Sequence, residues 1–118
     1  MASPFTYLEL HSSDPKKARR FYTELLGWKT KPAEVPGRDY HEIDAGEGLP
    51  GGLTDAFIEG VGGWLVYVRV DDAQASTRRA RELGAQVLRD CVQIPEGVFS
   101  VVRDPAGSAV GLFQPAKR

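Results

Sequence analysis

The side chains that could perform chemistry are few and widely spaced. The chain has two histidines, His11 and His41, and a single cysteine, Cys91. Neither histidine has a second metal-binding side chain at a recognisable spacing, and no neighbouring base marks Cys91 as a nucleophile. The glycine pairs at 51–52 and 62–63 lack the strand-to-helix context of a phosphate-binding loop. No catalytic residue stands out, so we expect both histidines at the surface near strand ends and Cys91 as a small buried hydrophobe.

Two strand-like segments, residues 5–11 (FTYLELH) and 64–70 (WLVYVRV), carry a more informative pattern. Successive side chains of a strand point to opposite faces of its sheet. One face is aliphatic, with leucines in the first segment and valines in the second, and is expected to pack on a helix. The other face is mostly polar or aromatic and carries Tyr7, Glu9 and His11 in the first segment and Leu65, Tyr67 and Arg69 in the second.

A helix is predicted after each of these strands. Asp14 and Pro15 are typical of an N-cap and a first helical residue, and Gly27 is typical of the residue that ends a helix. Between them, apolar residues recur at helical spacing, namely Ala18, Phe21, Tyr22, Leu25 and Leu26. Asp72 and Gly84 bound a second predicted helix in the same way.

Three short strand-like segments, separated by glycine or proline, follow each helix. They cover residues 28–34, 39–45 and 51–57 in the first half and residues 85–94, 97–103 and 108–114 in the second. The chain therefore follows the order βαβββ twice, with an offset of about 58 residues. The sequence predicts one α+β domain, 1–118, with units at 1–58 and 59–118.

Three groups of short motifs lie in order along nearly the whole chain. They are Asp14-Pro15 with Phe21-Tyr22 and residues 25–28 (LLGW), residues 68–72 (VRVDD) with 81–85 (RELGA), and residues 103–107 (RDPAG) with Leu112-Phe113. In this arrangement the chain resembles the vicinal-oxygen-chelate superfamily of glyoxalases, bleomycin-resistance proteins and dioxygenases. The resemblance implies a mixed sheet that tandem βαβββ units curl into a cup around a ligand.

The resemblance also bears on metal binding. Metal-dependent members place one ligand on the first strand and one on the last strand of each unit, and these ligands are His, Glu or Gln. Transferred by motif, the four positions fall on Tyr7, Gly52, Leu65 and Gly111. Leucine and glycine offer no side-chain donor, and tyrosine, with a pKa of about 10, is a rare ligand. The resemblance thus implies a metal-free, bleomycin-resistance-like protein that needs no cofactor.

The residues facing the implied cup form the candidate ligand-binding site. Motif positions and strand alternation together give Tyr7, Glu9, Gly52, Leu65, Tyr67, Arg69, Gly111 and Phe113. Such a set suits a flat or partly apolar organic ligand held by a few polar contacts. Two other interpretations stay open: the tyrosines can be ordinary sheet aromatics, and Glu9 and Arg69 can form an ion pair that only fixes the sheet.

Composition limits the partners. Hydrophobic residues make up 42% and charged residues 26%, as in an ordinary globular domain. The 15 basic and 16 acidic residues are interspersed, which argues against a nucleic-acid partner. No apolar run reaches the roughly 20 residues of a membrane span, and no secretory signal is evident, so we expect neither a membrane partner nor export from the cytoplasm. We expect a homodimer, because each unit leaves sheet edges to cover.

The sequence therefore predicts a small-molecule-binding protein that holds an organic ligand in an aromatic cup. The alternative is a metal-dependent lyase, isomerase or dioxygenase that uses non-standard ligands; its candidates are Glu9, His11, His41 and Glu42. A metal-free enzyme is a third hypothesis, because one scaffold of this kind hosts many functions.

Overall fold

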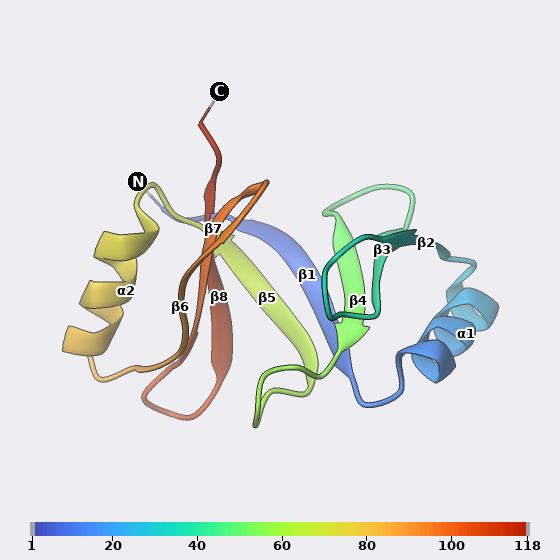
Figure 1. Cartoon of the computed structure of the whole chain (residues 1–118), viewed down its shortest axis with the longest axis horizontal. Coiled ribbons are helices and arrows are strands. Elements are labelled where there is room, and N and C mark those ends of the chain that lie inside the picture. Colours follow the sequence, from blue (N-terminus) through green and yellow to red (C-terminus); the bar gives the residue numbers. More distant parts are fainter. Residues whose placement is uncertain (1, 118) are drawn as a thin grey trace. The chain divides into compact units, whose positions relative to one another are not determined.

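The computed structural model describes residues 2–117, and its elements follow the order βαβββ twice (Figure 1). The first run is β1 (Phe5–Ser12), α1 (Pro15–Leu26), β2 (Lys29–Ala33), β3 (Tyr40–Asp44) and β4 (Gly51–Asp55). The second run is β5 (Gly63–Arg69), α2 (Ala73–Glu82), β6 (Gln86–Ile94), β7 (Gly97–Arg103) and β8 (Ala109–Pro115). The predicted repeat is confirmed.

The chain divides into two compact units. The first unit is Tyr7–Leu65; the second begins at Val66 and also takes in the residues before Tyr7. The first unit has the strand order β2-β3-β4-β1 and the second has β5-β8-β7-β6. In each unit one neighbouring pair is parallel, β1 with β4 and β5 with β8, and the other pairs are antiparallel. The strands of each unit therefore pair in both directions, and the predicted α+β class is confirmed.

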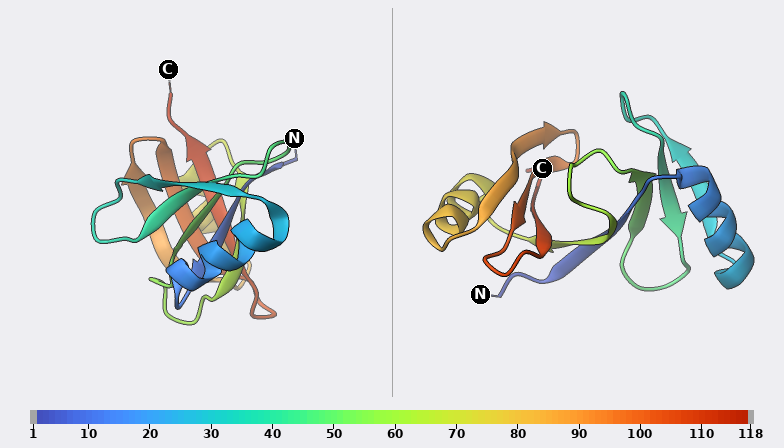
Figure 2. Two further views of the ribbon diagram at one scale, coloured as in Figure 1. Left: turned by 90° about the vertical axis from the view of Figure 1, so that its right-hand side faces the viewer. Right: turned by 90° about the horizontal axis from the view of Figure 1, so that it is seen from below.

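Each unit has one helix, which lies on one side of that unit's strands (Figure 2). Helix α1 begins as expected: a side-chain oxygen of Asp14 accepts from the N–H of Lys17 at 3.1 Å. It ends where Gly27 takes the left-handed conformation, with a φ of 70°, and donates its N–H to the carbonyl of Thr23. Neither of the described helices is long and apolar enough to cross a bilayer.

The core of the first unit shows which face of β1 is buried under its helix. Its buried members are Leu10, Ile43 and Leu53, and they pack against Ala18, Tyr22 and Trp28. Leu10 of β1 pairs with Leu53 of β4, so both side chains point toward α1. The leucine face of β1 thus packs on the helix as predicted, and Tyr7, Glu9 and His11 point to the opposite side of the sheet.

The second unit has the predicted strand phase as well. Val68 of β5 pairs with Leu112 of β8, which pairs in turn with Ser100 of β7. The Ser100 hydroxyl lies 2.7 Å from the hydroxyl of Thr77 on α2. Paired residues share a face, so the valine face of β5 lies under α2 and Tyr67 points away from it.

Two expectations about burial differ from the structure. Along α1 only Ala18 and Tyr22 pack on the core, whereas the other members of the apolar stripe, Phe21, Leu25 and Leu26, are more than half exposed. Cys91 is half-buried, at an irregularity in the pairing of β6 where its φ is 48°. At this bulge the backbone N–H of Cys91 donates to the Ser100 hydroxyl at 2.9 Å. It does not pair with a backbone carbonyl of the neighbouring strand, as it would in a regular sheet.

Candidate functional site

A chain of hydrogen bonds occupies the face of the first unit's sheet opposite α1. The hydroxyl oxygens of Tyr7 and Tyr40 are 2.6 Å apart. Tyr40 donates to Oε2 of Glu9 at 2.8 Å, and Oε1 of Glu9 lies 2.7 Å from Nε2 of His11. We call these four side chains, Tyr7, Tyr40, Glu9 and His11, the Glu9 network.

The sheet register explains how this network assembles. Strand β4 lies between β1 and β3, and its Gly52 pairs with Glu9 on one side and with Glu42 on the other. Because glycine has no side chain, the hydroxyls of Tyr7 and Tyr40 meet above it. A Cβ at Gly52 would overlap both phenol oxygens. The network therefore requires the glycine that stands at a predicted ligand position.

The centre of the Glu9 network is shielded from water. Glu9 is 7% exposed and His11 is 2% exposed, so the surface position predicted for His11 is wrong. The ring of Phe57 stacks on the imidazole, with 5.2 Å between the ring centroids. On Phe57 in turn lies the Arg38 guanidinium, 4.2 Å from the centroid of the ring. Strand alternation correctly put His11 on the face of Glu9, but no sequence pattern predicted that Phe57 would cover it.

Electrostatics determine which members of the network donate. Burial, and next the Coulombic effect of Glu9, raise the pKa of Tyr40 well above its ordinary value of 10. Tyr40 therefore stays neutral and can donate its hydrogen to the carboxylate. Two donors on one buried carboxylate compensate for the water that Glu9 loses.

The second unit repeats the contact between a tyrosine and a glycine. Tyr67, which is 6% exposed, pairs with Gly111 of β8, and a Cβ at Gly111 would overlap the Tyr67 ring. The same ring meets Phe99 edge to face at 6.1 Å. Phe99 pairs with Phe113, which places both phenylalanines on the face of Tyr67. Sequence reasoning did not identify Phe99, although it is aromatic and lies in a predicted strand.

The predicted site residues thus fall into two groups. The first unit brings Tyr7, Glu9 and Gly52 together on one face and buries Leu65 at the end of the unit. The second unit brings together Tyr67, Gly111, Phe113 and an exposed Arg69, because β5 and β8 pair there in register. Their part in binding a ligand stays a prediction.

The residues at the implied metal-ligand positions do not fit a divalent metal. Phenol groups fill the space above Gly52 and Gly111, and Leu65 is apolar. A metal site needs several imidazole, carboxylate or thiolate donors around one point. Within residues 2–117, no three His, Cys, Asp or Glu side chains come close enough to hold a metal ion.

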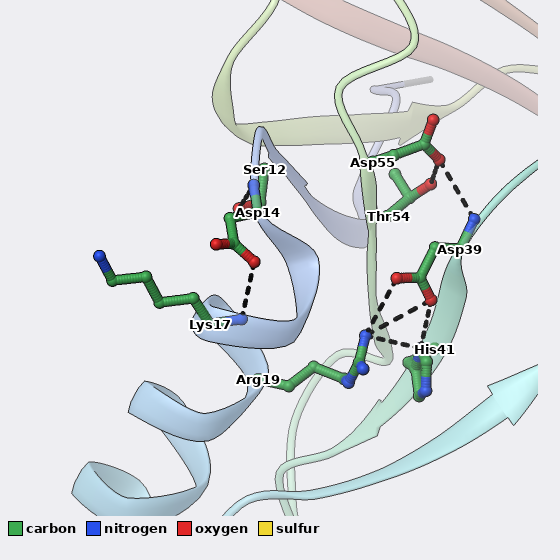
Figure 3. A network of polar contacts seen from close by, with 8 residues as sticks. All are labelled: Ser12, Asp14, Lys17, Arg19, Asp39, His41, Thr54 and Asp55. Atoms are coloured by element: carbon green, nitrogen blue, oxygen red, sulfur yellow. Dashed lines mark hydrogen bonds and ion pairs between the residues drawn. The ribbon is translucent and has the colours of Figure 1, made fainter.

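The non-standard donors weighed for a metal are also separated by the sheet. His41 pairs with Leu53, so it points toward α1, away from the face of Glu9. There its Nδ1 lies 3.3 Å from Arg19 and 3.4 Å from Asp39 (Figure 3). Partial burial, and next Arg19, lower the pKa of His41, so the neutral ring is favoured. His41 belongs to a polar contact between α1 and the start of β3.

An apolar groove of about 410 Å³ opens on the α1 side of the first unit. Tyr22, Trp28 and Trp64 line part of it. The Tyr22 and Trp28 rings stack at 5.3 Å, and Trp64 meets Trp28 edge to face at 6.0 Å. Sequence reasoning did not predict this groove, because Trp64 comes from a segment distant in the chain.

Two βαβββ units, each with one helix and a mixed set of strands, are the fold that the resemblance to the vicinal-oxygen-chelate superfamily implies. The chain belongs to the glyoxalase-like domain family, whose family model matches residues 7–113. It is similar in fold to methylmalonyl-CoA epimerase from Mycobacterium tuberculosis, with a TM-score of 0.68 at 20% identity over 96% of this chain and 88% of the other.

Two curated proteins are similar in sequence. The protein CFP32 of Mycobacterium tuberculosis, which carries a glyoxylase name, is 34% identical over 92% of this chain and 42% of its own length. The anthracycline biosynthesis protein DnrV of Streptomyces peucetius is 27% identical over 92% of this chain and 46% of its own. The chain thus spans less than half the length of these relatives.

Proposed function

We propose that the protein is a metal-free, small-molecule-binding member of its family, of the bleomycin-resistance-like type. The observation that carries the proposal is the filling of the space above Gly52 by the hydroxyls of Tyr7 and Tyr40. At this position metal-dependent members of the superfamily have a metal ligand. Here the phenol groups of Tyr7 and Tyr40 fill the space and are hydrogen-bonded to each other and to the buried Glu9 carboxylate. Phenols offer a flat surface for stacking and a polar end for hydrogen bonding, which suits an organic ligand.

The second unit supports the same kind of ligand. Its face away from α2 offers the half-buried ring of Phe113 and the exposed Arg69, with the buried ring of Tyr67 between their strands. An apolar aromatic surface with one cation suits a planar molecule that carries a few polar groups. The similarity to DnrV supports this class, because its name connects it with anthracyclines, which are planar and polycyclic.

An anthracycline is a suitable first probe, since its own fluorescence reports binding. We expect saturable binding in the presence of excess EDTA, because no step of the proposal uses a metal. Tyr7→Ala should weaken binding about 5- to 100-fold, the scale of a lost buried aromatic contact. Tyr22→Phe, on the opposite face of the sheet, is the matched control and should leave affinity unchanged. Binding that requires added metal, or equal losses in both variants, would contradict the proposal.

We also propose that two copies of the chain pair through α1. Leu25, at 62% exposure, and its neighbours Phe21 and Leu26 form an apolar strip that a partner would cover. Light scattering should then give twice the 12.9 kDa of one chain. Leu25→Glu should produce monomers, whereas Leu83→Glu, at an equally exposed leucine after α2, should not. A wild-type mass of one chain at every concentration would refute pairing.

The proposed partners are therefore a small organic molecule and a second copy of the chain. The interspersed 15 basic and 16 acidic residues favour neither a nucleic acid nor a membrane surface. We place the protein in the cytoplasm, in keeping with its single cysteine.

A further inference from the structure

The Glu9 network has a fixed hydrogen-bond direction. An ionised carboxylate can only accept, so Glu9 accepts from Tyr40 at one oxygen and from Nε2–H of His11 at the other. Tyr40 has one hydrogen and gives it to Glu9, so its oxygen must be the acceptor in the 2.6 Å contact with Tyr7. Tyr7 is therefore the donor in that contact.

Both ends of the network consequently present acceptors. Tyr7 has given its one hydrogen to Tyr40, so toward any further partner its oxygen can only accept. In a neutral imidazole, donation from Nε2 leaves Nδ1 of His11 as the acceptor nitrogen. Nδ1 is fully buried and has no hydrogen-bond partner among the described residues.

We infer that this face selects ligands that donate a hydrogen bond, such as phenols, alcohols or amines, over ligands that can only accept one. The inference rests on the proposed function and names the ligand chemistry of that same site. Half-buried Tyr7 makes the contact, since Phe57 covers the His11 end. Tyr40, Glu9 and His11 are positioning residues, because they set which way the Tyr7 hydrogen points.

The test compares two probes that share one ring system. 1-Naphthol can donate a hydrogen bond, whereas 1-methoxynaphthalene can only accept. Each is titrated into the full chain and followed by amide NMR shifts. We expect both probes to shift the amides of Tyr7, Tyr40 and Gly52, with 1-naphthol bound about fivefold more tightly, the scale of one net hydrogen bond.

Glu9→Gln tests the direction of the network with almost no change in shape. Nε2–H of His11 needs an acceptor, so the amide oxygen keeps the His11 bond and the NH₂ group turns toward Tyr40 and donates to it. Tyr40 then donates to Tyr7, and the Tyr7 hydrogen is released toward the ligand. The preference for 1-naphthol should disappear or reverse. Glu42→Gln is the matched control, because Glu42 is exposed on the same sheet face and lies outside the network.

Each result decides between the inference and the proposed function. Equal affinities in the wild-type protein, or an unchanged preference in Glu9→Gln, would overturn the inference and leave ligand binding at this face intact. If neither probe shifts the Tyr7, Tyr40 and Gly52 amides, the proposed function falls, and the inference falls with it. Loss of the preference in Glu42→Gln would also overturn the inference, because charge alone would then set the selectivity.

Discussion

Gly111→Ala should lower the free energy of unfolding by about 3 kcal/mol. A Cβ at this position would overlap the ring of Tyr67, which is buried and held by Phe99. The ring must leave its place, and overpacking of this kind costs about 1–3 kcal/mol or more. Urea unfolding followed by circular dichroism measures the change, with the slope m checked for constancy.

The matched control is Gly62→Ala, because a Cβ there meets nothing within 4 Å and the backbone needs no positive φ. Both substitutions stiffen the unfolded chain equally, so their difference isolates the contact with Tyr67. Gly62→Ala should change stability by less than about 0.5 kcal/mol. In a protein that already carries Tyr67→Ala, Gly111→Ala should lower the free energy of unfolding only slightly. The effects of the two substitutions on stability should therefore be strongly non-additive. Equal effects of the two glycine substitutions would show that the Tyr67 ring is free to move.

The same contact shows how far sequence reasoning reaches. Alternation along β5 correctly predicted that Val68 packs on the helix and Tyr67 on the other face, because the pleat fixes a period of two. The pairing of Gly111 with Tyr67 comes from the register of two parallel strands, which alternation within one strand does not predict. The Tyr67 ring fills the space that a side chain at Gly111 would take. This depends on the rotamer of Tyr67, which no sequence pattern predicts.

The Glu9 network was only half predictable. Tyr7 and Glu9 follow from alternation within one strand, as Tyr67 does. Tyr40 reaches Glu9 only because β4 lies between β1 and β3, which is a property of sheet order and not of local spacing. His11 was expected at the surface because it ends a strand, but Phe57, from the segment after β4, folds over it. Contacts supplied by a distant loop leave no trace in the periodicity of the covered strand.

Alkaline pH should destabilise the protein through Tyr40. Burial and the neighbouring Glu9 raise its pKa above the ordinary value of 10, which the unfolded chain retains. Above pH 10 the unfolded state therefore loses a proton that the folded state keeps, so stability falls as pH rises. Below pH 10 the contribution of Tyr40 to the free energy of unfolding is fully present. Above pH 10 it falls by about 1.4 kcal/mol for each pH unit.

Urea unfolding between pH 8 and pH 11.5 should show this slope, and Tyr40→Phe should remove about 1.4 kcal/mol per pH unit from it. At pH 8 the same variant should already be less stable by about 1–3 kcal/mol, because Glu9 loses a donor and Tyr7 loses an acceptor. Tyr22→Phe removes a hydroxyl outside the network and is the control, so contributions common to all three proteins cancel in the comparison. An equal dependence of stability on pH in Tyr40→Phe and wild type would contradict this prediction. It would mean that Tyr40 ionises as readily in the folded protein as in the unfolded chain, although its hydroxyl is buried against the Glu9 carboxylate.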